Sequence, residues 1–158
     1  MGVLKLILLS VLVSVVFQDL RDRSVYWFLF PAIGVCAGIL FYQETSATVF
    51  LETTVLNLLF IGILLFVIFL YSTYKLKLKL SDTFGLGDGL LFIALAFSFA
   101  PLTFLIVFVF GLICSLLLHL ILKKSKSETV PLAGYMSLFF ALIYIAHWNG
   151  ILTTVYTL

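Results

Sequence analysis

Residues Pro101 to Leu122 read PLTFLIVFVFGLICSLLLHLIL, a stretch without a single charged side chain. A helix needs about 20 mostly apolar residues to cross a membrane. The stretch is apolar on every face rather than striped, as expected where lipid covers one side of a helix and other helices cover the rest. It therefore predicts a transmembrane helix, with Pro101 in its first turn, where a missing N–H costs nothing.

The same apolar character extends outward from this stretch in both directions. Charged and helix-breaking residues divide the chain into six apolar segments. These are 3–18, 25–42, 53–73, 87–100, 101–122 and 131–149. Strands of a membrane barrel would be about ten residues long with alternating polarity, a pattern that these segments lack. The sequence predicts an all-α polytopic membrane protein with six transmembrane helices, forming one domain over residues 1–158.

The composition excludes several other classes of protein. Of the 158 residues, 64% are hydrophobic and 10% charged, against about 45–50% and 25% in soluble domains. A soluble fold of this size cannot bury so much apolar surface. Disordered chains, coiled coils and proteins that bind nucleic acid through a basic surface are excluded as well. Cys36 and Cys114 lie in apolar runs without ligand spacing, which predicts packing thiols rather than a zinc site or a disulfide.

The basic residues indicate an orientation in the membrane. Eight of the nine fall on one side of a six-helix arrangement: Arg21, Arg23, Lys75, Lys77, Lys79, Lys123, Lys124 and Lys126. The connection 43–52 on the other side has no basic residue. Short basic loops stay in the cytoplasm, so we expect a plasma (inner) membrane protein with both termini outside. Cleavage of the first segment as a signal peptide is the alternative, but no small-x-small site precedes Gln18.

Two aspartates fall at a similar depth in this arrangement. Asp88 is twelve positions before Ala100, or about 18 Å of helix, and Asp19 is fourteen positions after Lys5, or about 21 Å. Both side chains would lie below the cytoplasmic surface, where ionisable groups are costly and usually mark a pathway or a site. The alternative is that each aspartate caps a helix or pairs with a nearby basic residue.

Glycines surround the second of these aspartates, in the sequence Gly85-Leu86-Gly87-Asp88-Gly89. Glycine lets a backbone approach another chain closely, so we expect Gly85, Gly87 and Gly89 to contact substrate. Two neighbouring carboxyls do not readily ionise together, so one can act as an acid while the other acts as a base on water. This is the chemistry of an aspartic peptidase, and it requires no metal or organic cofactor.

Gly85-Leu86-Gly87-Asp88 resembles the GxGD signature of intramembrane aspartic proteases. Asp19-Leu20-Arg21-Asp22-Arg23-Ser24-Val25 resembles the first-aspartate motif of the type IV prepilin peptidase and preflagellin peptidase family. Val130-Pro131-Leu132-Ala133-Gly134 resembles the Pro-containing start of the last helix in that family. The resemblance implies that Asp19 and Asp88 are the catalytic pair. It also implies cleavage, at the cytoplasmic face, of short basic leader peptides from pilin-like precursors.

The chain departs from the family pattern at three points. Tyr26-Trp27 stands where Pro-Asn is usual, and Gly89 follows Asp88 where a small or aliphatic residue and then Lys are common. The Cys-rich cytoplasmic domain of the larger bacterial enzymes has no counterpart here, which leaves no place for their N-methylation of mature pilin. An inactive or repurposed member of the family is therefore an alternative.

Other residues and functions compete with this hypothesis. Asp22 is an alternative first aspartate, but Asp19 keeps the family spacing to Arg23 and lies deeper, so we expect Asp22 beside Arg21 or Arg23. His119 and His147 fall near opposite ends of their segments and are expected at the membrane interface rather than in one site. A small proton-coupled transporter and a non-catalytic membrane subunit remain the alternative functions. The expected partners are precursor proteins and membrane lipid, with no nucleic acid.

Overall fold

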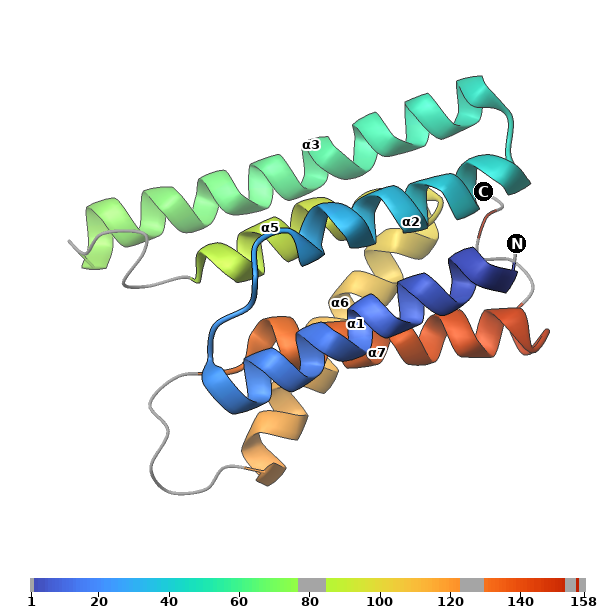
Figure 1. Cartoon of the computed structure of the whole chain (residues 1–158). Helices are drawn as coiled ribbons and strands as arrows, with labels where there is room; N and C mark the ends of the chain where they lie inside the picture. The colour runs from blue at the N-terminus through green and yellow to red at the C-terminus, as the bar shows by residue number, and fades with distance from the viewer. Residues whose placement is uncertain (1, 77–84, 123–129, 153–155, 157–158) are drawn as a thin grey trace.

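A computed structural model describes residues 2–76, 85–122, 130–152 and 156 (Figure 1). The predicted cytoplasmic residues Lys77, Lys79, Lys123, Lys124 and Lys126 lie outside the described residues. Within the described part the chain is all-helical. Its elements are α1 (Gly2–Asp22), α2 (Leu29–Glu44), α3 (Ala47–Tyr71), the short π-helix η1 (Ser72–Leu76), α5 (Leu86–Leu95), α6 (Pro101–Leu122) and α7 (Leu132–Trp148).

Each of the six predicted segments overlaps one of the α-helices, although α1 continues to Asp22 and α3 begins at Ala47, six residues before the predicted start. Three of them, α1, α6 and α3 with its continuation to Tyr74, are long and apolar enough to cross a membrane. The other three, α2, α5 and α7, are shorter apolar helices. The all-α class is confirmed, and the long apolar helices indicate a membrane protein, whereas a six-fold crossing stays a prediction.

The helices form a bundle in which neighbours in space are not always neighbours in sequence. The first and last helices, α1 and α7, pack extensively on each other, and α1 also contacts α2. The short helix α5 contacts α2, α3 and α7. Figure 1 shows α6 running obliquely to the other helices, and it contacts α3 and α7. At one end of the bundle Lys5 Nζ lies 5.1 Å from the ring centre of Trp148, as expected if both residues mark the outer side.

The core is a single apolar cluster drawn from all six helices. Its fully buried members include Leu12 of α1, Ile33 of α2, Leu91 of α5, Phe108 of α6 and Phe140 of α7. The long helix α3 adds Ile61 to the cluster, packs partly buried apolar residues against it, and has a small set of buried polar residues. These are Thr53, Thr54 and Asn57.

Large apolar side chains also cover the outside of the bundle. Ile63, Phe66 and Phe110 are examples, all more than half exposed. Apolar surface on this scale is unusual for a soluble protein. It is expected where lipid surrounds the helices, because lipid tails are as apolar as these side chains.

The helix that carries Asp88 is shorter than predicted. The sequence predicts a segment over 87–100, but α5 ends at Leu95. The chain then tightens, with Phe97 N donating to Ala94 O at 3.4 Å and Ser98 N to Leu95 O at 3.0 Å, the bonding of a 3₁₀ turn. A helix could not continue through Ala100 in any case, because Pro101 disfavours a helical conformation in the residue before it. As predicted, Pro101 opens α6.

Candidate active site

Asp19 lies in the last turn of α1 and is buried, with 8% of its surface exposed. Its Oδ2 accepts a hydrogen bond of 2.6 Å from the backbone N–H of Gly134 in the first turn of α7. A carboxylate near a helix N-terminus is favoured by the helix dipole and satisfies an otherwise unpaired amide. Asp19 is thus buried among the helices, while its predicted depth in a membrane stays a prediction.

Asp88 is half-buried in the first turn of α5. Its backbone N–H donates to Gly85 O at 3.0 Å, and its side chain folds back toward Gly85. The carboxyl interacts electrostatically with that of Asp19 and with the backbone amide of Ala133. The two aspartates therefore approach each other at one end of the bundle, although they are far apart in the sequence.

The N-terminus of α7 connects the two carboxyls. Ala133 and Gly134 are consecutive residues in its first turn, the amide of Gly134 pairing with Asp19 and that of Ala133 lying near Asp88. The helices α1 and α5 are joined through α2 and α7, each of which packs on both. We call Asp19, Asp88 and the amides of Ala133 and Gly134 the aspartate site.

Among the glycines around Asp88, Gly85 has a local packing reason to be glycine. A Cβ on Gly85 would lie 2.9 Å from Asp88 Oδ2, so any larger residue would push the carboxyl away. A Cβ on Gly87 would lie 3.4 Å from the ring of Phe30, which indicates close packing of α5 on α2. Gly85 is exposed, and Gly87 and Gly89 are half-buried. Their predicted contact with substrate stays a prediction.

Asp22 is separate from the aspartate site. It is exposed, and its Oδ1 lies 3.7 Å from Arg21 Nε, an exposed pair as predicted. Arg23 follows with a left-handed backbone conformation, φ 53°, which ends α1. Asp19, not Asp22, is thus the α1 aspartate that the fold turns toward Asp88.

Neither histidine lies on α1 or α5, the helices that carry the aspartates. His147, near the C-terminus of α7, pairs through Nδ1 with Leu152 O at 2.7 Å. His119 lies in the last turn of α6. Among the described residues, no group of three His, Cys, Asp or Glu side chains could hold a metal ion. Cys36 is buried, Cys114 is half-buried, and both are free thiols.

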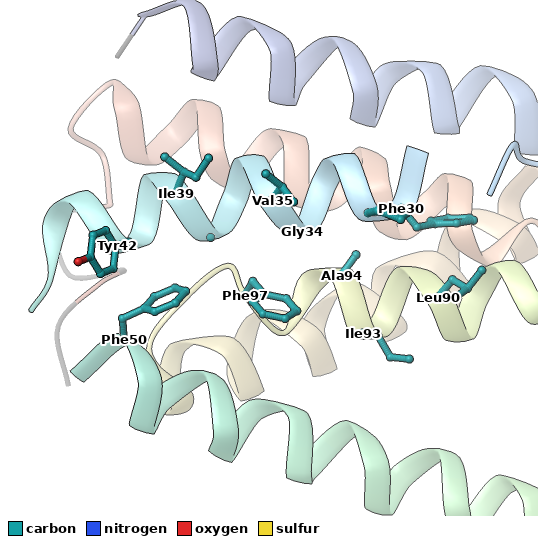
Figure 2. A pocket seen from close by; sticks show the side chains of 12 residues that line it. Phe30, Gly34, Val35, Ile39, Tyr42, Phe50, Leu90, Ile93, Ala94 and Phe97 are labelled. Atoms are coloured by element: carbon teal, nitrogen blue, oxygen red, sulfur yellow. The ribbon is translucent and has the colours of Figure 1, made fainter. Parts of the chain in front are cut away.

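An apolar groove of about 530 Å³ runs along α5 on the side of α2 and the first turn of α3 (Figure 2). Leu90 and Phe30 lie toward one end, close in sequence and space to Gly87 and Asp88, and Tyr42 and Phe50 lie toward the other. Gly34 lines the groove without a side chain, and a Cβ at this position would lie 3.4 Å from Ala94 Cα. None of the residues that line the groove belongs to the aspartate site, and Leu90, Ile93 and Ala94 lie on the face of α5 that is turned away from Asp88.

Three features of this region were not predicted from the sequence. The backbone amides of α7 have no signature of their own, and only the resemblance of residues 130–134 pointed to this segment. Gly34 and Gly38 form a Gly-x-x-x-Gly pattern against Ala94 and Phe97; this spacing in an apolar helix is a recognisable signal for close helix packing. The third feature is Asn57, an isolated amide within the apolar sequence of α3.

Comparison of the chain with protein-family models, with curated proteins and with solved structures finds no match.

Proposed function

We propose that the chain is a membrane aspartic endopeptidase in which Asp19 and Asp88 are the catalytic pair. The observation that carries the proposal is that these two carboxyls, one from α1 and one from α5, lie beside the consecutive backbone amides of Gly134 and Ala133 at the N-terminus of α7. Paired carboxyls at short range supply both a base and an acid, which hydrolysis of a peptide bond requires.

In the proposed reaction a water molecule lies between the two side chains. The first aspartate takes a proton from the water while the water oxygen attacks the scissile carbonyl carbon. The second aspartate donates a proton to the carbonyl oxygen. The tetrahedral intermediate then collapses: the C–N bond breaks, the first aspartate gives the proton it took from water to the leaving nitrogen, and the second aspartate recovers a proton from the hydroxyl as the carbonyl reforms. Each carboxyl thereby returns to its starting state.

The proposed substrates are prepilin-like, pseudopilin-like or preflagellin-like precursors, because the residues around both aspartates resemble that family of peptidases. Arg21 and Arg23 lie at the same end of α1 as Asp19. If this end is cytoplasmic, as the basic residues predict, cleavage takes place at the cytoplasmic face.

A non-catalytic membrane subunit is the second candidate, and one observation favours it. Both carboxyls lie at helix N-termini, Asp19 at that of α7 and Asp88 at that of its own helix. This is also where aspartate stabilises a helix without any chemistry. The two candidates predict different results when a carboxylate is replaced by a neutral amide of the same shape.

Co-expression with a candidate precursor tests the proposal. We expect Asp19→Asn and Asp88→Asn each to lower the cleavage rate by at least about a hundredfold, because each removes a group that transfers a proton. The product is identified by its new N-terminus. Asp22→Asn is the matched control, a change of the same chemistry in the same helix on an exposed residue, and it should cleave at the normal rate. Normal processing by Asp88→Asn would refute the proposal.

A further inference from the structure

Asn57 is a buried polar side chain in the middle of a long apolar helix. It is 2% exposed. Its Nδ2 donates two hydrogen bonds of 2.9 Å, to Ala96 O and to Phe99 O, just past the C-terminus of α5. Carbonyls at the end of a helix have no partner within the helix. One amide from α3 therefore satisfies two backbone acceptors in the turn that links α5 to α6.

The position of α5 along the bundle needs such an external constraint. With 10 residues it is about 15 Å long, half the thickness of a typical hydrocarbon core of about 30 Å. Its own length therefore cannot fix its depth in a membrane. Its packing on Gly34 and Gly38 of α2 is apolar. Apolar contacts have little directional preference, whereas a hydrogen bond fixes the positions of its donor and acceptor and so opposes sliding of α5 along α2.

We infer that Asn57 is a positioning residue, which holds α5 at the depth where Asp88 meets Asp19. The side chain acts on the C-terminal end of α5, and Asp88 occupies the first turn at the other end of the same short helix. Because a short helix moves as a rigid body, a shift at the C-terminal end of α5 also shifts its N-terminal end. Loss of the two bonds would therefore move Asp88 without touching the aspartate site directly.

The first measurement of this inference rests on the proposed peptidase activity. In Asn57→Leu we expect kcat to fall by about tenfold to a hundredfold, since misplacement of a reacting group by about 1 Å has this effect. KM should stay within about twofold, because the inferred role concerns alignment rather than binding. The matched control is Thr54→Val on the same buried face of α3. The Thr54 hydroxyl has no hydrogen-bond partner among the described residues, so this variant should keep the wild-type kcat.

A second measurement does not depend on any enzymatic activity. Leu20 and Leu86 are 45% and 70% exposed and lie next to Asp19 and near Asp88. Spin labels on Leu20→Cys and Leu86→Cys, with Cys36 and Cys114 changed to Ala, report the distance between α1 and α5 by pulsed electron paramagnetic resonance. We expect Asn57→Leu to broaden and shift the distance distribution, and Thr54→Val to leave it unchanged.

The two measurements separate failure of this inference from failure of the proposed function. An unchanged distance distribution in Asn57→Leu would overturn the role of Asn57, whether or not the chain cleaves peptides. A shifted distribution would support that role even if the wild-type chain cleaved no precursor, an outcome that would count against the peptidase alone. If Asn57→Leu does not accumulate in the membrane, Asn57→Ala removes the amide donor with a smaller side chain and is subject to the same criteria.

Discussion

Gly134 sets how closely α7 approaches Asp19. Its N–H donates to Asp19 Oδ2 at 2.6 Å, and a Cβ at this position would lie 3.1 Å from that oxygen and 3.2 Å from Asp19 Cβ. A methyl group at Gly134 would therefore come too close to both the carboxyl oxygen and the Cβ of Asp19. Because Asp19 is buried beside α7, the side chain has little room to yield without leaving its hydrogen bond.

We predict that Gly134→Ala weakens both the fold and the proposed activity. Overpacking of a close contact costs about 1–3 kcal/mol, which should lower the thermal unfolding temperature in detergent along with the cleavage rate. Gly62→Ala is the control, because a Cβ there meets nothing within 4 Å. Alanine favours a helix over glycine by about 0.5–1 kcal/mol, so this control should be neutral or slightly stabilising. Equal stability of the two variants would contradict the close contact at Gly134.

At the level of single residues the sequence predicts acidic positions better than their partners. Asp19 and Asp88 stand out because ionisable groups are rare within apolar segments, and the structure brings them together. The amides of Ala133 and Gly134 could not be predicted in this way, since every residue except proline carries an N–H. Which amides face a carboxyl depends on how α7 packs against α1, and that is a property of the fold.

Among the helices, α6 and α5 show what fixes a boundary. α6 begins at Pro101 and ends at Leu122 as predicted, because a proline and a basic run mark its limits. α5 ends five residues before the apolar segment does. Apolar residues continue through Ala100, so hydropathy carries no sign of the break. The hydrogen bonds from Asn57 to Ala96 O and Phe99 O come from another helix, and a local pattern cannot reveal them.

The contact between α2 and α5 has a sequence signal of its own, the four-residue spacing of Gly34 and Gly38. A Cβ on Gly34 would lie 3.4 Å from Ala94 Cα, and one on Gly38 would lie 3.5 Å from Phe97 Cβ. Small residues four positions apart let helix backbones come close in a membrane. The pair therefore predicts a helix contact but not its partner, because any of the other helices could supply the facing surface.

For the whole molecule the arrangement of basic residues predicts an orientation that can be measured. Arg21 and Glu44 are both exposed and lie near the C-termini of α1 and α2. In right-side-out vesicles with Cys36 and Cys114 replaced by Ala, a membrane-impermeant maleimide should label Glu44→Cys. It should label Arg21→Cys only after the membrane is disrupted. Labelling of Arg21→Cys in intact vesicles would invert the topology and place the aspartate site on the outer side.

Cross-linking tests most directly whether the side chains at positions 19 and 88 lie close together. Cysteines at these two positions, in a chain with Cys36 and Cys114 changed to Ala, are treated in native membranes with a short bifunctional thiol reagent. Mass spectrometry then identifies the joined peptides. The control pair is Lys5→Cys with Trp148→Cys, from residues in contact at the other end of the bundle. We predict that both pairs cross-link. Cross-linking of the control pair without cross-linking of the cysteines at 19 and 88 would contradict the closeness of Asp19 and Asp88 and the hydrolysis proposed from it.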